Sequence, residues 1–312
     1  MRRQGRSRFS RRQMLGASLA MGFSGLHVTF AQSIPGASPT ADDAYALPEM
    51  LADVDWLETH VDDPDMVVVA LTPREEFERG HIPGSRQIDW PALEATDTTD
   101  DSLAAWRGDV ERTITELNIT PAMTVVAYDE GTLFAARLWW VLHYLGHDDV
   151  RVLNGGLPAW QAAGNEVEIG SGGTDFPATE PYVGDPRPDV IAQVDEVVDS
   201  LDDPDVAIVD ARTADEYAEG HVPGAVNVNF PLNALPEAPR FWKPAGELRA
   251  MYEEAGVTPD KHVIPYCSTG VRSAVTYFTL RLIGYARVSL FTGSWAEWTS
   301  YPDLPVTTGD QP

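Results

Sequence analysis

Four short apolar runs recur along the chain and set its expected architecture. They lie at residues 66–70, 124–128, 206–209 and 262–266. Continuous apolar runs of this length are typical of β-strands that are buried on both faces of a sheet. Pro265 cannot donate to a sheet ladder, but it stands one residue from the end of its run, so we still predict a strand there.

A helical pattern follows the second and the fourth run. In the first case apolar residues recur at helical spacing up to Gly146, and in the second up to Gly284. The residues that carry the two patterns are Leu138, Val141, Leu142 and Leu145, and then Val275, Phe278 and Leu282. Strand, helix and strand in this order imply parallel strands with right-handed crossovers, and therefore an α/β sandwich.

The chain repeats itself. RGHIPGS at 79–85 returns as EGHVPGA at 219–225, an offset of 140 residues. Later landmarks return at an offset of 138, namely Gly146 at Gly284, Gly155 at Gly293 and Trp160 at Trp298. The second unit is therefore two residues shorter between these landmarks, a difference that a change in one loop can account for. The sequence therefore predicts a tandem duplication of a unit of roughly 120 residues.

The composition divides the chain into four expected parts. Residues 1–31 form a leader, 46–165 the first unit and 190–305 the second unit. Residues 166–189 between the units are rich in Gly, Ser, Thr, Pro and acids and lack periodicity, which predicts an interdomain linker.

The leader has the character of an export signal. It holds six arginines and no acid, and a mildly apolar stretch at 14–30 follows them. SRRQML at 10–15 resembles the twin-arginine signal, and TFA at 29–31 would suit cleavage before Gln32. We therefore expect export to the periplasm or the medium. The alternative is a basic tail or membrane anchor, although the apolar stretch is too short and polar to span well.

The net charge of the chain is strongly negative. It holds 22 Lys and Arg against 48 Asp and Glu, a net charge of −26, and removing the leader would leave −32. A surface this acidic repels phosphate backbones, so nucleic acid is excluded as the expected partner. Acids in excess with only two lysines suit a protein that works in high salt, although a GC-rich genome could produce the same bias.

The one cysteine is the candidate nucleophile. Cys267 stands where the fourth predicted strand turns into a helix, and the first unit has Asp129 at the matching place. This is the carboxyl edge of a parallel sheet, where open α/β proteins bind ligands. Backbone N–H groups of the loop, the helix dipole and Arg272 would all favour the thiolate, which is a nucleophile. The alternative is a buried structural cysteine, which the following Ser, Thr and Gly make less fitting.

Several motifs in order resemble the two-domain rhodanese family of thiosulfate and 3-mercaptopyruvate sulfurtransferases. They are DAR at 210–212 with EY at 216–217, GHVPGA at 220–225, CSTGVR at 267–272 and GSWAEW at 293–298, with GHIPG at 80–84, ARLWW at 136–140 and NGG at 154–156 in the first unit. The resemblance covers roughly residues 46–305. It implies two α/β domains, each a five-stranded parallel sheet flanked by helices, of which only the second is catalytic.

The resemblance also implies the reaction. The Cys267 thiolate would attack the sulfane sulfur of thiosulfate, release sulfite and keep a persulfide, which cyanide or a thiol would then remove. The loop residues Ser268, Thr269, Gly270, Val271 and Arg272 would stabilise the thiolate and the persulfide through their N–H groups. Arg272 would also hold the donor's anionic group or keep the sulfur ionised. Arg212 could pair with an acid or line the site.

Three departures from the family pattern bear on the donor and on local structure. Ser268 is neither the basic residue of thiosulfate enzymes nor the glycine of mercaptopyruvate enzymes. Glu216 stands where vertebrate members place a substrate-binding arginine. Thr292 and Asn154 occupy positions that are usually Asp in the closing motifs. Thiosulfate is the expected donor because an exported protein meets inorganic sulfur anions, and 3-mercaptopyruvate remains the alternative.

There are two alternatives to sulfur transfer by an enzyme. A related phosphatase would have five residues between Cys and Arg, whereas four lie between Cys267 and Arg272, too few to cradle a phosphate. A carrier that holds sulfane sulfur for a partner protein remains open, and the protein acceptor is unknown.

No cofactor or metal is expected. One cysteine excludes an internal disulfide and a cysteine-based zinc site, and no GxxxxGK[ST], HExxH or calcium loop is present. His81 and His221 precede Pro-Gly turns and are expected to fix loop geometry rather than to act in catalysis.

Overall fold

Two parallel sheets organise the chain. The computed structural model describes residues 44–172 and 180–312, so the leader predicted at 1–31 lies outside the described residues. The first sheet has the order β1-β5-β4-β2-β3, and all of its strands are parallel. Its strands are β1 (Leu51–Ala52), β2 (Met66–Leu71), β3 (Arg86–Ile88), β4 (Thr124–Tyr128) and β5 (Val150–Leu153). The sequence predicted the strands at β2 and β4 correctly.

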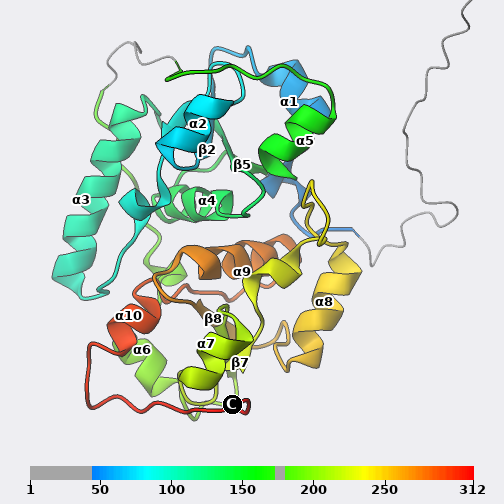
Figure 1. Cartoon of the computed structure of the whole chain (residues 1–312). Coiled ribbons are helices and arrows are strands. Elements are labelled where there is room, and N and C mark those ends of the chain that lie inside the picture. Colours follow the sequence, from blue (N-terminus) through cyan, green and yellow to red (C-terminus); the bar gives the residue numbers. More distant parts are fainter. Residues whose placement is uncertain (1–43, 173–179) are drawn as a thin grey trace, which may run out of the picture. The chain divides into compact units, whose positions relative to one another are not determined.

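Helices cover both faces of the first sheet, as Figure 1 shows. One face packs against α1 (Val54–His60), α2 (Arg74–Arg79) and α5 (Gly156–Ala162), and the other against α3 (Asp100–Glu116) and α4 (Ala135–Tyr144). Val67 and Val69 of β2 point to the α3–α4 side, while Val68 and Ala70 point to the other. This alternation explains why the strand reads as a continuous apolar run.

The second domain repeats this layout with fewer regular strands. Its sheet has the order β7-β6-β8, with β6 (Val206–Asp210), β7 (Val226–Asn227) and β8 (His262–Tyr266). Parallel bridges from Val263 to Val288 and from Leu290 to Ile191 continue the order of the first sheet. The helices are α6 (Val194–Asp199), α7 (Ala214–Glu219), α8 (Ala245–Glu254), α9 (Val271–Leu282) and α10 (Ser294–Trp298). Short 3-10 turns complete the domains at η2 (Pro48–Met50), η3 (Trp90–Leu93), η4 (Pro188–Val190) and η5 (Phe230–Asn233).

Pro265 explains why the second sheet has three regular strands among the described residues and not the expected five. In β8 the N–H and C=O of one residue point to the same side, and Phe291 donates to the Pro265 carbonyl from the segment beside it. Pro265 has no N–H to return to that segment. At the same place in the first sheet stands Ala127, which keeps a regular ladder with β5. The proline therefore reduces the ladder to isolated bridges.

One hydrophobic core joins the two domains. Helix α4 packs against α9, and their buried residues belong to a single cluster with α3 and α8. Phe278 is fully buried, and its ring centroid lies 5.0 Å from those of Trp139 in the first domain and Trp242 in the second. No helix within residues 44–172 and 180–312 is long and apolar enough to cross a membrane.

Phe278→Ala should lower the free energy of unfolding by about 3–5 kcal/mol, because it empties a fully buried aromatic site. Urea unfolding followed by tryptophan fluorescence and far-UV circular dichroism measures this change. Both probes should report one transition, since the core is shared. Ile169→Ala is the control, because Ile169 is 75% exposed and the change should stay within about 0.5 kcal/mol. Two separate transitions would contradict a shared core.

Candidate active site

Cys267 lies at the carboxyl edge of the second sheet, as predicted. It follows β8 directly, is only 1% exposed, and is the free cysteine of the chain. Both sides of its backbone are fixed by the start of α10. The Cys267 N–H donates to Ser294 Oγ at 3.1 Å, and the Trp295 N–H donates to the Cys267 carbonyl at 3.0 Å. The thiol therefore stands on a rigid junction between strand and loop.

Ser294 is held in a strained conformation to make this contact. Its φ is +57°, in the left-handed region that favours glycine, and its side chain is fully buried. Its hydroxyl accepts from the Cys267 N–H and donates to the Phe291 carbonyl at 2.8 Å. The sequence motif around 293–298 marked this segment, but its contact with the nucleophile could be seen only in the fold.

Gly270 brings a backbone donor to the sulfur. Its N–H lies 3.2 Å from Cys267 Sγ, and its φ is +86°. A Cβ at this position would come within 2.6 Å of the Thr292 carbonyl oxygen, so the site requires glycine. Helix α9 begins at the next residue, Val271, so its positive end faces the loop that carries the sulfur. The arrangement stabilises negative charge at Sγ.

The first domain fills the equivalent place with a carboxylate. Asp129 is buried, and its two carboxylate oxygens accept four backbone N–H groups at 2.7–3.2 Å. Burial raises the pKa of Asp129, and these four N–H groups oppose that rise. The loops are not identical, because Gly131 and Leu133 have positive φ in the first domain and Gly270 in the second. In both domains, however, the loop after this strand donates to the side chain at its start, with four N–H groups to Asp129 and with the Gly270 N–H to Cys267 Sγ.

A cavity of about 390 Å³ opens next to Cys267. Its walls are Arg212, Glu216, Glu219, Gly220, Ser268 and Trp295. It therefore brings together two of the residues predicted for the site, Arg212 and Ser268. Thr269 is half-buried, and Val271 is buried at the start of α9, so their side chains do not line it.

Arg272 is bound to a carboxylate at the edge of this cavity. Its guanidinium makes two hydrogen bonds of 2.8 Å to Glu216 and one to the Ser268 hydroxyl. The Arg272 hydrogen bonds lower the pKa of Glu216 to about 2, and Glu216 raises that of Arg272. No pattern in the sequence indicated this pairing of Arg272 with Glu216. The expected role of Arg272 in holding the donor stays a prediction.

Arg212 fulfils both of the alternatives considered for it. It pairs with Asp210 at 2.6 Å and donates to the Gly220 carbonyl at 2.6 Å, and it is 3% exposed. Its guanidinium lies 4.5 Å from the ring centroid of Trp295, which also faces the cavity. Arg212 thus braces the cavity wall while Asp210 balances its charge.

The two histidines before the Pro-Gly turns are structural, as expected. His81 and His221 are fully buried, and Nδ1 of each lies 2.8–2.9 Å from the carbonyl four residues earlier. Their rings stack on Phe77 and Tyr217 with centroids 3.8 and 3.7 Å apart. Both hold the helix–turn junction and do not line the cavity beside Cys267.

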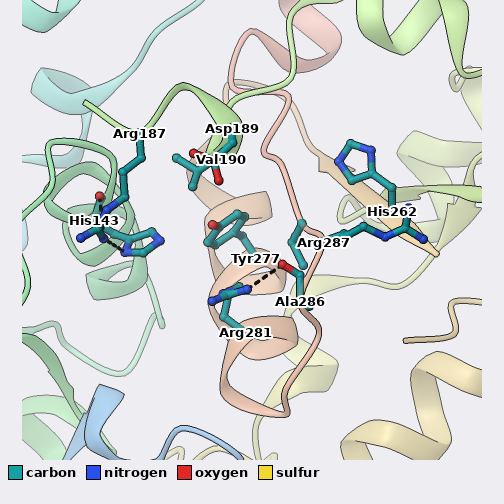
Figure 2. A pocket seen from close by; sticks show the side chains of 10 residues that line it. His143, Arg187, Asp189, Val190, His262, Tyr277, Arg281, Ala286 and Arg287 are labelled. Atoms are coloured by element: carbon teal, nitrogen blue, oxygen red, sulfur yellow. Dashed lines mark hydrogen bonds between the residues drawn. The ribbon is translucent and has the colours of Figure 1, made fainter. Parts of the chain in front are cut away.

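A second cavity, of about 460 Å³, lies at the opposite ends of β8 and α9 (Figure 2). Burial, Arg187 and Arg281 lower the pKa of His143 in this cavity to about 4. Figure 2 shows Arg187 beside His143, and Arg281 donating to the Ala286 carbonyl. Its lining holds no thiol. Among the described residues, Ser268, which directly follows Cys267, lines the cavity of about 390 Å³ and not this one.

Comparisons with known proteins agree with this geometry. The model of the rhodanese-like domain matches residues 53–163 and 193–301. A thiosulfate sulfurtransferase of Pseudomonas aeruginosa is 36% identical over 78% of this chain and 91% of its own. The sulfur carrier protein TtuD of Thermus thermophilus is 32% identical over 86% and 99%. The 3-mercaptopyruvate sulfurtransferase of Escherichia coli is 30% identical over 81% and 95%.

Solved structures share the fold. A complex of EanB with ergothioneine aligns with 84% of this chain and 70% of its own, with a TM-score of 0.73 and 26% identity. Another EanB structure, in which ergothioneine is covalently linked with a cysteine persulfide, aligns with 83% and 70% at a TM-score of 0.74 and 25% identity. The family model covers more than half of this chain, and these relatives cover most of it. The chain therefore belongs to the rhodanese-like domain family and carries the domain twice.

Proposed function

We propose that this protein is a sulfurtransferase that moves sulfane sulfur from thiosulfate to a thiophilic acceptor through a persulfide on Cys267. The observation that carries the proposal is the environment of the thiol. A free cysteine at the end of a parallel strand receives a backbone N–H at 3.2 Å and faces the start of α9, and its neighbour Ser268 lines an open cavity. The first domain has Asp129 at that place and so lacks the nucleophile.

The proposed reaction has two displacement steps. The Cys267 thiolate attacks the sulfane sulfur of thiosulfate, the S–S bond of the donor breaks, and its electron pair leaves with sulfite. A Cys267 persulfide anion remains. Cyanide or a thiol then attacks the outer sulfur, the bond between the two sulfurs breaks, and the thiolate returns. No cofactor enters either step.

The loop after β8 stabilises both anions in this scheme. The outer sulfur of a persulfide lies two bonds beyond Cβ, the same number as the carboxylate oxygens of an aspartate. Asp129 shows that a loop at this place can turn four N–H groups towards atoms at that reach. In the second domain the loop N–H groups near Gly270 would serve the outer sulfur in the same manner.

Cys267→Ser should abolish sulfur transfer, with a loss of about a thousandfold or more, because a hydroxyl is a far weaker nucleophile than a thiolate. Thiocyanate formation from cyanide measures this, with thiosulfate and 3-mercaptopyruvate compared as donors. Thiosulfate should be the better donor in the wild type. Turnover that survives in the serine variant would contradict the proposed mechanism.

The name of the Thermus thermophilus relative favours one second candidate, a carrier that hands sulfur to a dedicated partner. The same assay separates the two functions. A carrier would take up one sulfur per chain from thiosulfate and release none to cyanide, whereas the enzyme turns over many times.

Carboxylates at the cavity mouth should weaken the binding of the dianionic donor. Glu216→Gln removes one of them and frees Arg272, so it should lower KM for thiosulfate at low salt by about fivefold. The matched control is Glu219→Gln, which removes the same charge from the cavity and leaves the Arg272–Glu216 pair intact. Steady-state kinetics should therefore show a smaller effect in the control.

The dependence of KM on salt and on pH also tests whether Glu216 weakens the binding of the donor. Molar salt should lower KM in the wild type and shrink the difference between the two variants, since salt screens exposed charges. The pKa of Glu216 is lowered to about 2, so this carboxylate stays charged as the pH falls until it approaches that value. The effect of Glu216→Gln should therefore be constant between about pH 8 and pH 4. A KM that rises in this variant would show that Glu216 assists the donor.

We also propose that the protein is exported by the twin-arginine route, on the strength of the leader sequence at 1–31. Replacement of Arg11 and Arg12 by Lys should retain the full-length protein in the cytoplasm. Cell fractionation and the N-terminal mass of the exported protein measure this, with Arg2→Lys and Arg3→Lys as the control outside the motif. Equal export of both variants would refute the route.

A further inference from the structure

An arginine of the first domain reaches the active-site loop of the second. Arg137 lies in α4 and is fully buried. Its Nη1 donates to the Gly270 carbonyl at 3.4 Å and its Nη2 to Thr292 Oγ1 at 3.1 Å. Nε donates to the Leu93 carbonyl at 3.2 Å. Every one of these acceptors is uncharged, so the guanidinium is buried without a carboxylate bound to it.

A buried cation of this kind requires a nearby negative charge. Burial lowers the pKa of Arg137 to about 10, which leaves the side chain protonated at neutral pH. Cys267 opposes this lowering more than Glu94 does, and Glu94 is only half-buried. The ring of Trp140, whose centroid is 4.6 Å from the guanidinium, adds cation–π attraction but no charge. Cys267, three residues before the Gly270 backbone N–H that donates to its sulfur, is thus the acidic group in this buried region with the larger effect on Arg137.

The other two arginines near Cys267 each bind a carboxylate, although Arg272 also interacts with Cys267 itself, so that Glu216 and Cys267 both raise the pKa of Arg272. Arg272 on α9 is paired with Glu216 on α7, and Arg212 after β6 is paired with Asp210. Glu297 on α10 accepts hydrogen bonds from the backbone and hydroxyl of Thr98 in the first domain. Among the described groups that face the loop, Arg137 is thus the cation whose charge no bound carboxylate balances.

The contact with Gly270 also orients the loop. In a planar trans peptide the C=O and the N–H point in opposite directions. Because Arg137 holds the Gly270 carbonyl, the N–H of Val271 in the same peptide unit points away from Arg137. The Gly270 N–H donates to Cys267 Sγ. Arg137 therefore fixes the residue that supplies the donor to the sulfur.

We propose that Arg137 is a positioning residue and the buried counter-charge of Cys267, so that the non-catalytic first domain takes part in the chemistry of the second. This inference rests on the proposed function, since it assigns Arg137 a role toward the same thiol. It gives the first domain a part in the reaction although that domain lacks a nucleophile of its own.

The pH dependence of Cys267 alkylation tests the proposal without any sulfur transfer. Arg137→Met removes the charge and keeps an apolar side chain of similar length. It should move the midpoint of the curve of iodoacetamide reaction rate against pH upward by about one pH unit or more. Arg137→Lys should restore part of the shift. The matched control is Arg187→Met, which removes the same charge from the distant cavity and should leave the midpoint unchanged.

A second variant keeps Arg137 in place. Thr292→Asp puts a carboxylate where a hydroxyl now meets the guanidinium, so it should neutralise Arg137 and also move the midpoint upward. Thr292→Val, which adds no charge, is its control and should shift the midpoint little. Circular dichroism and thermal unfolding show which variants are folded. An unchanged midpoint in whichever of Arg137→Met and Thr292→Asp is folded overturns the inference.

The two proposals fail in different ways. A wild type that reacts readily with iodoacetamide in an Arg137-dependent manner but does not turn over thiosulfate would contradict the proposed function and leave the role of Arg137 intact. Normal turnover of thiosulfate in a folded Arg137→Met variant, with an unchanged midpoint of the alkylation curve, would contradict the role of Arg137. It would leave the proposed function intact.

Discussion

A negative charge on sulfur must be stabilised in a place from which water is largely excluded. Cys267 is 1% exposed, so the solvation that a thiolate would receive in water has to come from the protein. The Gly270 N–H and the start of α9 supply it, and we propose that the buried Arg137, which holds the Gly270 carbonyl, adds to it. The rigid support of Ser294 and Trp295 keeps the sulfur in register with these groups. The fold around the site holds these groups at fixed positions around the sulfur.

The duplication shows how little of the scaffold this requirement changes. Both domains place a loop whose backbone N–H donates to the side chain at its start after the equivalent strand, and both start a helix directly beyond the loop. In the first domain Asp129 occupies the loop with its own carboxylate, which accepts the N–H groups of the loop. In the second domain the cysteine side chain is one bond shorter than the aspartate side chain at the matching place. The outer sulfur of a persulfide would add that bond. The first domain then contributes through α4, whose packing against α9 brings Arg137 to Gly270.

The sequence was sufficient for the elements that depend on local patterns. The apolar runs gave β2, β4, β6 and β8, and the helical spacing gave α4 and α9. The position of Cys267 followed from its place between a strand and a helix, because the carboxyl edge of a parallel sheet is set by topology. The sequence correctly predicted that Pro265 is compatible with strand β8. Its effect on the neighbouring segment could not be predicted, because that effect depends on which side of the strand lacks the N–H donor.

The contacts between residues far apart along the chain could not be read in this way. Arg137 is 133 residues from Gly270 along the chain, and Arg272 is 56 from Glu216. No periodicity links such pairs, and only the packing of α4 on α9 and of α7 beside the loop brings them together. The motif around 136–140 was visible in the sequence, but its two tryptophans and its arginine are equally compatible with ordinary core packing.

The most direct test of the central claim is the mass of the intact protein after reaction with thiosulfate in the absence of an acceptor. The account predicts that each chain gains the mass of one sulfur atom, that peptide mapping places this sulfur on Cys267, and that cyanide removes it. A chain that gains no sulfur, or gains it in the Cys267→Ser variant as well, would contradict the account.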